Sequence, residues 1–461
     1  MQKLADIKKV YFLGIGGIGM SALARYFAGQ GIAVSGYDRM STELTLQLEK
    51  EGIAVHYQDD PAQVPSDLNI VDSLIVYTPA VPANHKELNV LIDRGFNIHK
   101  RAEVLGIICN SQRTIAVAGT HGKTSVSTMI AHIMKSSGTG CSAFLGGISK
   151  NYQTNLLIDN TDSPWVVAEA DEFDRSFLQL KPELAVITSM DADHLDIYGS
   201  HEKVIESFHL FAKQIKGGGF LVIKKGLSVG DDLSNIKIFN YSITQSADFC
   251  AENIELQDGF YQFDLKTPDF RIEKLVLNYP GLLNVENAVA ASAMAVLAGV
   301  STEEIRHGLA TYSGVKRRFD IQLNNGTYVL IDDYAHHPEE LRATIQSVRD
   351  IYKVRKITGV FQPHLYSRTK DFASGFAKSL DLLDEIVLLD IYPARELPIE
   401  GVTSELIFNQ MQNPNKKLCN KKELLSLAVS FKPGIVLIMG AGDIDALVQP
   451  VKEQLLKNEN S

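Results

Sequence analysis

The sequence feature that most constrains the fold is a glycine-rich turn placed between a buried strand and a helix. The apolar run 114–118 predicts the strand, residues 119–124 form the turn, and residues 125–135 have helical character. Small residues let backbone N–H groups approach phosphate oxygens, and a helix N-terminus adds about half a positive charge. The pattern therefore predicts a phosphate-binding loop in an α/β domain with a mostly parallel sheet.

Within this loop, Lys123 is expected to reach the β- and γ-phosphates of ATP, and the Thr124 hydroxyl is expected to bind Mg²⁺. The sequence has Val117 where the common form of the motif has glycine, so it departs from that form by one residue. The residues predicted to bind the phosphates are Gly119, Thr120, His121, Gly122, Lys123, Thr124 and Ser125.

Acidic residues follow two further strands of the same segment. Residues 169–174 come directly after the apolar run 166–168, and residues 193–196, which include His194, follow the run 185–188. The carboxyl ends of parallel strands share one edge of a sheet, and oxygen ligands suit Mg²⁺. We expect a magnesium site beside the phosphate loop, although imidazole is an unusual Mg²⁺ ligand. Solvated loop charge is the alternative interpretation.

A second glycine turn lies near the N-terminus. Gly14, Gly16 and Gly19 follow the apolar run 10–13, and Asp38 lies 22 residues beyond Gly16. This form is typical of dinucleotide binding, with a pyrophosphate at the helix N-terminus and a ribose hydroxyl on the carboxylate. A nucleotide-sugar diphosphate presents the same two groups. A nicotinamide-dependent oxidoreductase therefore remains an alternative interpretation, but it does not explain the phosphate loop at residues 119–124.

The chain of 461 residues contains three segments that each begin with a buried strand and alternate strand and helix. We predict an α/β protein of three domains at 1–110, 111–313 and 314–461. The first and third are Rossmann-like, and the central one is of the P-loop ATPase type. Residues 251–279 alternate apolar and polar around Asp258-Gly259, which predicts a small antiparallel insertion in the central domain.

Composition excludes several classes of protein. Lys and Arg number 45 against 55 Asp and Glu, a net charge of −10, which argues against nucleic-acid binding. Cys109, Cys141, Cys250 and Cys419 form no C-x-x-C pair, so neither a zinc site nor a disulfide framework is indicated. No signal-peptide pattern and no apolar run near 20 residues is present. We expect a cytoplasmic protein that binds no membrane and is a monomer or a homodimer.

Nine motifs in order resemble the Mur ligase family, the ATP-dependent amide ligases of bacterial cell-wall synthesis. The first glycine turn resembles in particular the alanine-adding branch of that family. The motifs occupy residues 14–21, 119–124, 169–172, 193–196, 284–288, 317–319, 332–338, 361–364 and 440–444. Their order and spacing make the resemblance specific over nearly the whole chain.

The resemblance implies a ligase with three small-molecule substrates and Mg²⁺ as cofactor. UDP-N-acetylmuramate would bind the first domain, ATP the second and L-alanine the third. An acyl phosphate would form, and the products would be UDP-N-acetylmuramoyl-L-alanine, ADP and phosphate. Such a reaction serves peptidoglycan synthesis, and through it cell shape and division. Another ligase of the family, adding a different amino acid or a peptide, and a P-loop ATPase or switch that binds a partner remain alternatives.

The resemblance also implies residue roles. Thr124, Glu169 and His194 would hold Mg²⁺. Further ATP contacts would come from Asn284 and Asn287 near the adenine, Arg318 at the γ-phosphate and Asp333 at the ribose. The UDP-sugar would contact Gly16, Gly17, Ile18, Gly19, Met20, Ser21, Asp38, His56 and Thr78. The amino-acid and catalytic residues would be Tyr334, His336, His337 and Arg368, with His336 or His337 a candidate to deprotonate the amine.

Three positions depart from the family pattern. Leu283 precedes Asn284 where the family often has histidine, and Leu365 replaces the arginine of Pro-His-Arg. Phe208 occupies the position at which several relatives carry a carbamylated lysine. We also expect domain closure about a hinge near residues 311–316, which would keep water from the acyl phosphate.

Overall fold

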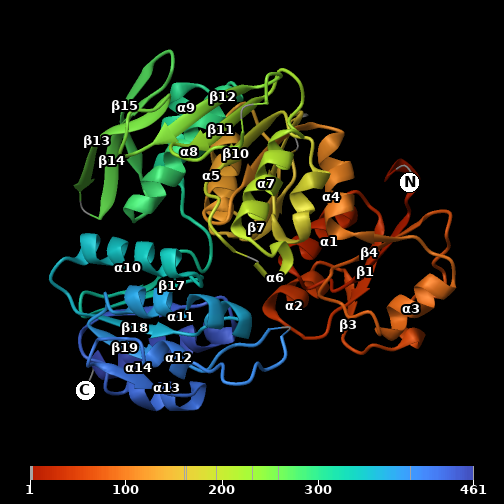
Figure 1. Cartoon of the computed structure of the whole chain (residues 1–461). Coiled ribbons are helices and arrows are strands. Elements are labelled where there is room, and N and C mark those ends of the chain that lie inside the picture. The colour runs from red at the N-terminus through yellow and green to blue at the C-terminus, as the bar shows by residue number, and fades with distance from the viewer. Residues whose placement is uncertain are drawn as a thin grey trace. The chain divides into compact units, whose positions relative to one another are not determined.

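The computed structural model describes residues 4–159, 161, 163–193, 195–230, 232–257, 259–394 and 396–459. Strands and helices alternate along the chain and build three sheets, which confirms the α/β class (Figure 1). The chain divides into two compact units, one of residues 1–252, 264–275 and 287–312, the other of residues 253–263, 276–286 and 313–461. The domain boundaries predicted at 110/111 and 313/314, and motion about 311–316, stay predictions.

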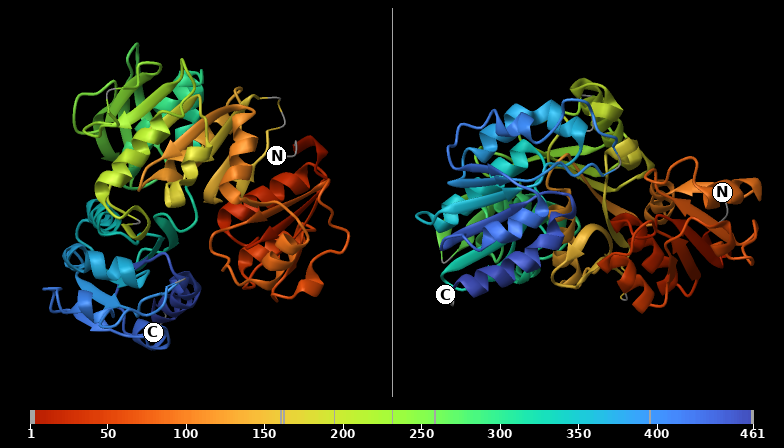
Figure 2. Two further views of the ribbon diagram at one scale, coloured as in Figure 1. Left: turned by 45° about the vertical axis from the view of Figure 1, so that its right-hand side comes forward. Right: turned by 90° about the horizontal axis from the view of Figure 1, so that it is seen from below.

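The first sheet has the strand order β3-β2-β1-β4-β5, with all strands parallel. Its strands are β1 (Lys9–Leu13), β2 (Ala33–Tyr37), β3 (Ala54–His56), β4 (Ser73–Tyr77) and β5 (Ile98–Lys100). Its helices are α1 (Ile18–Gly29), α2 (Glu43–Lys50), α3 (Lys86–Asp93) and α4 (Arg101–Asn110), with 3₁₀ turns η1 (Leu4–Asp6) and η2 (Pro61–Gln63). Figure 2 shows this sheet in red to orange.

Alternation along β1 explains why helices cover both faces of that sheet. Phe12 belongs to the apolar cluster that includes Phe27 of α1, whereas Tyr11 belongs to the cluster that includes Leu88 of α3. Successive side chains of a strand point to opposite faces, so a buried strand of this kind needs cover on each side. The order places a topological switch point between β1 and β4, where ligands of such sheets bind. The first sheet is therefore Rossmann-like, as predicted.

The central sheet has ten strands in the order β15-β14-β13-β12-β11-β10-β6-β9-β7-β8. They are β6 (Arg113–Ala118), β7 (Ser142–Ser149), β8 (Thr154–Leu157), β9 (Trp165–Glu169), β10 (Leu184–Ile187), β11 (Phe220–Lys224), β12 (Lys237–Ser242), β13 (Phe249–Gln257), β14 (Phe260–Lys266) and β15 (Arg271–Leu277). The helices are α5 (Lys123–Lys135), α6 (Leu195–Tyr198), α7 (His201–Ala212), α8 (Leu282–Leu297) and α9 (Thr302–Thr311), with the 3₁₀ segment η3 (Phe173–Gln179).

Strands β9 and β10 pair in parallel with β6 on its two sides. The register sets Val117 beside Glu169 and Ala118 beside Ile187, so all three strands end at one edge. The predicted insertion corresponds to β13, β14 and β15, which are neighbours in the sheet. Only residues 258 and 259 separate β13 from β14, and so short a connection joins antiparallel strands. Asp258 itself lies outside the described residues.

Helix α5 is buried over most of its length and carries a histidine inside the protein. His132 is 6% exposed; its Nδ1 lies 3.0 Å from the Tyr152 hydroxyl, and its Nε2 lies 2.9 Å from Thr311 Oγ1 at the end of α9. Burial lowers the pKa of His132 from 6.5 to about 4, and the nearby His307 adds to that lowering. The histidine is thus neutral at pH 7 and links α5 to the end of α9.

This burial predicts a pH dependence of stability. Between pH 6.5 and 4 the unfolded chain binds a proton at His132 that the folded chain excludes, so the free energy of unfolding falls as pH falls through that window. The loss reaches about 3 kcal/mol at pH 4. His132→Gln is expected to flatten this part of the profile, measured by urea unfolding at half-unit steps of pH. Parallel profiles for the two proteins would contradict the assignment.

The third sheet has the order β16-β17-β21-β18-β19-β20, with β16 antiparallel at one edge and the other pairs parallel. Its strands are β16 (Asp320–Asn324), β17 (Tyr328–Asp333), β18 (Ile357–Phe361), β19 (Glu385–Leu388), β20 (Lys416–Leu418) and β21 (Gly434–Met439). The helical segments are α10 (Pro338–Tyr352), α11 (Tyr366–Leu380), α12 (Glu405–Phe408), α13 (Lys421–Ala428), η4 (Asp443–Leu447) and α14 (Val448–Glu459).

Helices cover both faces of this sheet as well. Val360 belongs to a buried cluster with Leu424 of α13 and Val451 of α14. Its neighbour Phe361 faces the other way and packs on Phe376 of α11, with ring centroids 5.3 Å apart. The third sheet is therefore doubly wound, in agreement with the predicted Rossmann-like architecture.

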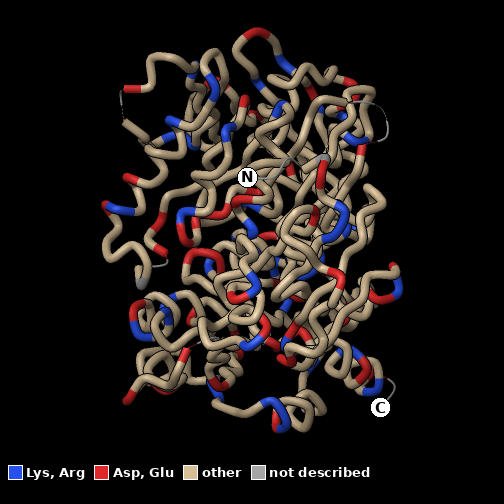
Figure 3. Tube along the Cα trace, turned by 90° about the vertical axis from the view of Figure 1, so that its right-hand side faces the viewer, with Lys and Arg blue, Asp and Glu red and all other residues tan. Residues whose placement is uncertain are grey.

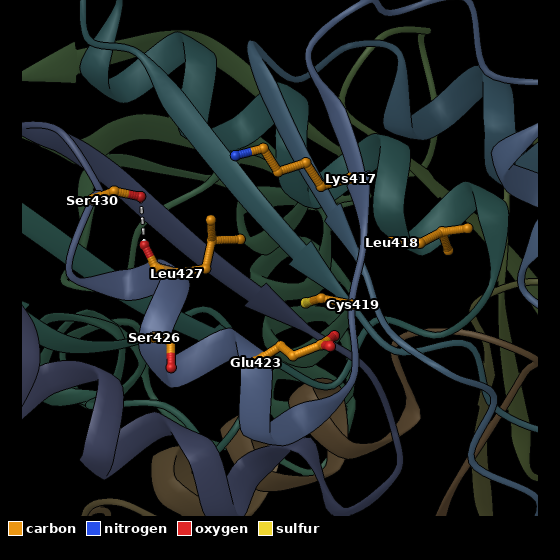
Figure 4. A pocket seen from close by; sticks show the side chains of 7 residues that line it. All are labelled: Lys417, Leu418, Cys419, Glu423, Ser426, Leu427 and Ser430. Carbon is orange, nitrogen blue, oxygen red and sulfur yellow. Dashed lines mark hydrogen bonds between the residues drawn. The ribbon is translucent and has the colours of Figure 1, made fainter.

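A surface pocket of about 460 Å³ lies beside the edge strand β20 and helix α13 (Figure 4). Its lining residues are Lys417, Leu418, Cys419, Glu423, Ser426, Leu427 and Ser430. Burial raises the pKa of Cys419 to about 11, so its thiol is protonated at neutral pH. None of the predicted site residues lines this pocket, which separates it from the site that the sequence predicts.

The four cysteines are free, and three of them are buried. Among the described residues, no helix combines the length and the apolar character needed to cross a membrane. Figure 3 shows acidic and basic residues interspersed along the trace. The net negative charge is therefore spread over the chain. Phosphate groups of substrates must accordingly be bound by individual positive side chains and backbone N–H groups near them.

Candidate active site

The predicted phosphate loop joins β6 to α5. Gly119 has φ of +139°, and a Cβ atom there would lie 2.1 Å from Oγ1 of Thr188. Gly122, with φ of +81°, is the N-cap of α5. Both positions need glycine, because an L side chain is disfavoured at these φ values and the first also lacks space. The loop thus presents its backbone at the helix N-terminus, as the motif predicts.

Two hydroxyl side chains after β10 hold this loop in shape. Thr188 Oγ1 donates to the carbonyl of His121 at 2.5 Å. The N–H of His121 donates to Ser189 Oγ at 2.7 Å, and that oxygen lies 2.8 Å from Thr120 Oγ1. No sequence motif assigns a role to Thr188 or Ser189. The one sequence property that points to them is that they are polar residues directly after a buried strand, which ends at the same sheet edge as the loop.

Lys123 makes three polar contacts at the start of α5. Its Nζ donates to the carbonyl of Gly119 at 2.7 Å and to Glu172 Oε1 at 2.9 Å, and lies 2.7 Å from Glu172 Oε2. Burial opposes the charge of Lys123, but the surrounding carboxylates, Glu172 first among them, raise its pKa overall. The lysine is therefore a charged ammonium inside the loop. Glu172 lies within a predicted acidic motif but had been given no role.

Thr124 and Glu169 form a pair of oxygen donors next to Lys123. Thr124 Oγ1 donates to Glu169 Oε1 at 3.1 Å, and the N–H of Gly146 donates to Oε2 at 3.1 Å. A Cβ atom at Gly146 would lie 2.1 Å from that oxygen, so β7 closes directly over the carboxylate. A hydroxyl and a carboxylate beside a phosphate loop are donors that fit Mg²⁺.

His194, the third predicted metal ligand, lies outside the described residues. Within the described ranges, no group of three or more His, Cys, Asp and Glu residues is placed to hold a metal ion. Phe208, at the position of the family's carbamylated lysine, is fully buried and packs edge-on against Phe177 with centroids 5.3 Å apart. That position is therefore part of the apolar core.

The other predicted ATP residues fall in both units. In the first unit, a Cβ atom added at Gly122 would lie 3.1 Å from Oδ1 of Asn287, so this side chain lies next to the loop. The Ser125 carbonyl accepts a hydrogen bond from the Tyr312 hydroxyl at 3.4 Å. In the second, Asn284 Nδ2 donates to the carbonyl of Pro280 at 2.6 Å. Leu283, which precedes it, is 42% exposed.

The N-terminal glycine turn packs closely against Asp38 and Thr78. The N–H of Gly16 donates to Asp38 Oδ2 at 2.7 Å, and the N–H of Met40 donates to Oδ1 at 3.2 Å. A Cβ atom at Gly14, where φ is +86°, would lie 2.5 Å from Thr78 Cγ2. Asp38 therefore shapes the turn through its backbone contacts, in addition to its predicted contact with substrate.

Two predicted UDP-sugar residues have inward side chains. Met20 is 1% exposed within the apolar cluster of α1, and Ser21 accepts a hydrogen bond from Asn155 Nδ2 at 3.0 Å. Asn155 Oδ1 in turn accepts from Arg25 at 2.5 Å, so α1 is tied to β8. Gly17, the residue before α1, and Ile18, its first residue, are exposed, and Gly19 is half-buried.

His56 is held by Glu87, a fully buried acid that no sequence motif points to. Its Nε2 lies 2.8 Å from Glu87 Oε1, and Tyr11 donates to Glu87 Oε2 at 2.6 Å. The only signal for Glu87 is an acidic residue in the first turn of a helix that faces the sheet. This network fixes the ring of His56 at the carboxyl end of β3.

In the second unit, Asp333 ends β17 with both carboxylate oxygens occupied. They accept the N–H groups of Phe319 at 2.7 Å and of Ala335 at 2.8 Å. Burial raises the pKa of Asp333, while Arg318 and the two N–H groups oppose that rise. The guanidinium of Arg318 lies 4.9 Å from the centre of the Tyr334 ring. Asp333, Arg318 and Tyr334 therefore form one cluster at the carboxyl end of β17.

His336 and Arg368 meet at His364. The His336 and His364 rings have centroids 6.1 Å apart, and Arg368 Nη1 lies 3.3 Å from His364 Nδ1. His336 also pairs with Glu340 at 3.1 Å. His337 is placed differently. It is the N-cap of α10, is 5% exposed and packs on Phe372.

Leu365, the other departure in this region, is 6% exposed and begins the turn into α11 with φ of +70°. A left-handed backbone is unfavourable for a leucine and concentrates at functional sites. The residue thus shapes the end of β18 through its backbone, next to His364.

Comparisons with known proteins show which proteins this chain resembles. Three family models match the chain: the Mur ligase family catalytic domain over residues 9–113, the Mur ligase middle domain over 117–295 and the Mur ligase glutamate ligase domain over 317–442. A UDP-N-acetylmuramate–L-alanine ligase of Parabacteroides distasonis is 53% identical over 98% of this chain and 99% of its own. A ligase of the same name from Porphyromonas gingivalis is 54% identical over 97% and 99%.

Solved structures of related ligases also resemble this chain. The UDP-N-acetylmuramate–alanine ligase of Thermotoga maritima superposes with a TM-score of 0.81 at 26% identity, covering 98% of this chain and 99% of that one. A murein peptide ligase of Psychrobacter arcticus shares the fold, with a TM-score of 0.71 at 23% identity, covering 97% and 98%. With relatives about half identical over 97% or more of its length, the chain belongs to the Mur ligase family.

Proposed function

We propose that this chain joins the carboxylate of UDP-N-acetylmuramate to the amine of L-alanine, with conversion of ATP to ADP and phosphate. The observation that carries the proposal is the phosphate loop with Lys123 and the Thr124–Glu169 pair, in a chain about half identical to ligases of that name. The product would enter peptidoglycan synthesis. The four free cysteines suit a reducing compartment, so we place the reaction in the cytoplasm.

The first step transfers the γ-phosphoryl group of ATP to the sugar carboxylate and gives an acyl phosphate. Both reactants are anions, so cationic groups must offset their repulsion. Lys123 supplies one positive charge at the loop, and we assign a second to Arg318. Mg²⁺ held by Thr124 and Glu169, with His194 as the third predicted ligand, would supply further charge neutralisation of the phosphates.

The second step is attack of the alanine amine on the acyl phosphate, with phosphate as leaving group. We assign the amino acid to the cluster of Tyr334, His336 and Arg368, in which Arg368 would pair with the substrate carboxylate. His336, whose Nδ1 lies 3.1 Å from Glu340, would take the proton of the amine. His337 would position α10 through its cap rather than touch substrate.

UDP-N-acetylmuramate would bind at the switch point of the first sheet. The turn at Gly16 would receive the diphosphate at the N-terminus of α1, with Asp38, His56 and Thr78 around it. The Glu87 carboxylate, 2.8 Å from Nε2 of His56, would hold that ring in place for a contact with the diphosphate.

The test is release of phosphate by the purified full chain with ATP, Mg²⁺, UDP-N-acetylmuramate and a panel of amino acids. Release is expected only when all components are present, with L-alanine the best acceptor. Serine and glycine are the discriminating competitors, because a pocket for one methyl group distinguishes them by about 1–3 kcal/mol. A better rate with another amino acid or peptide would assign the chain to another ligase of the family. Release without sugar would favour a simple ATPase.

A further inference from the structure

Glu172 is buried beside the phosphate loop and contacts the ammonium of Lys123. It is 2% exposed, and its two oxygens lie 2.9 and 2.7 Å from the Nζ atom of Lys123. The proposed reaction uses Glu169, three residues earlier, but gives Glu172 no task. A buried carboxylate opposite the loop lysine therefore needs an explanation.

The backbone around Glu172 is fixed. Its carbonyl accepts the Tyr198 hydroxyl at 2.6 Å. The chain then turns through Asp174 and Arg175, whose φ values of +52° and +54° are both left-handed. Left-handed backbone at consecutive non-glycine residues persists only where surrounding structure holds it. The segment thus aims the Glu172 carboxylate at the loop.

A carboxylate and a phosphate are alternative partners for one ammonium. Lys123 donates to the carbonyl of Gly119, a neutral acceptor, and to Glu172 Oε1, and Glu172 Oε2 lies 2.7 Å from the same ammonium. Phosphate oxygens that approach Lys123 must therefore displace or share that carboxylate. Burial raises the pKa of Glu172, although the Lys123 ammonium opposes that rise.

We propose that Glu172 is a positioning residue that holds and neutralises Lys123 while the loop is empty and releases it to the phosphates of the bound nucleotide. Through this contact the empty loop keeps the Lys123 ammonium on the Gly119 carbonyl and on Glu172. The contact also makes nucleotide binding weaker than it would be with a free ammonium. The inference rests on the proposed nucleotide site at residues 119–125.

The test is the Kd of ADP and of a non-hydrolysable ATP analogue for the full chain, by calorimetry at fixed Mg²⁺. Glu172→Gln keeps the shape of the side chain and removes its charge, so the Kd should fall on the order of 10-fold. Glu172→Asp keeps the charge but retracts it by one methylene. Its Kd should lie between that of the wild type and that of Glu172→Gln. The KM for ATP should follow the Kd, while the KM for UDP-N-acetylmuramate stays constant.

Asp174→Asn is the matched control. It removes one negative charge from the same segment, but Asp174 pairs with Lys100 at 2.7 Å and not with the loop. Its nucleotide Kd should equal that of the wild type. A Kd for Glu172→Gln that is unchanged or raised overturns the proposal. If that variant does not fold, as judged by thermal unfolding, an unchanged or raised Kd for Glu172→Asp overturns it equally.

Lys123→Met separates this inference from the proposed function. If Lys123→Met binds nucleotide as tightly as the wild type, the nucleotide site itself is wrong. If Lys123→Met abolishes binding while Glu172→Gln and Asp174→Asn behave alike, the nucleotide site holds and only the role of Glu172 fails.

Discussion

Lys123→Ala is expected to lower the rate of phosphate release by at least about 10²–10³-fold, the usual effect of removing one charge-stabilising donor. The physical reason is that the phosphoryl group moves between two anions, and Lys123 is the ammonium inside the loop. Binding of UDP-N-acetylmuramate should be unchanged, because its proposed site uses the turn at residues 14–21. Steady-state phosphate release and calorimetry with the UDP-sugar measure the two effects separately.

The structure adds a stability effect to that variant. Without the ammonium, Glu172 stays buried without its partner and must either keep an uncompensated charge or take up a proton, and breaking a buried pair in this way typically costs about 3–5 kcal/mol. The double variant Lys123→Ala with Glu172→Gln removes both charges and should regain most of that stability without regaining turnover. Full turnover in either variant would refute the assignment of the phosphate loop.

Gly119→Ala should also lower turnover by about 10²-fold or more, since it distorts the donors that meet the phosphates. The new Cβ would lie 2.1 Å from Oγ1 of Thr188, on a backbone with φ of +139°. Thr188 cannot retreat without losing its hydrogen bond to the His121 carbonyl, so the loop itself must shift. The measurement is nucleotide affinity by calorimetry together with phosphate release.

Gly217→Ala is the control for that substitution. A Cβ atom at Gly217 would meet no atom within 4 Å, and the residue does not have a left-handed φ. It should bind nucleotide and turn over like the wild type. Wild-type nucleotide affinity in Gly119→Ala would mean that the loop does not approach the phosphates through its backbone.

The structure confirms the predicted order of strands and turns. That order could be predicted because short apolar runs and glycines in the local sequence specify it. The apolar run before Gly119 forms β6, and the helix begins at Lys123 where the motif requires it. The same holds at the N-terminus, where β1 leads into the turn and α1. Buried parallel strands appear in a sequence as continuous apolar runs, and glycine at positive φ marks the turns between them.

The supporting residues of the site could not be predicted, because nothing in their local sequence distinguishes them. Thr188 and Ser189, directly after β10, brace the loop at His121 from 67 and 68 residues further along the chain, because parallel strands are joined by long crossovers. Glu87 reaches His56 from helix α3, and His364 joins His336 to Arg368. These contacts depend on which strands become neighbours in the sheet.

The sequence alone therefore determined the α/β class, the two glycine turns, the family and the residue types that carry charge to the phosphates. Those properties reside in short contiguous motifs and in the periodicity of apolar residues. The tertiary structure alone decided the partners. It paired Lys123 with Glu172 and Thr124 with Glu169, and it turned His337 into a helix cap. Partners of this kind follow from strand order and register, which bring residues distant in sequence to one edge of a sheet.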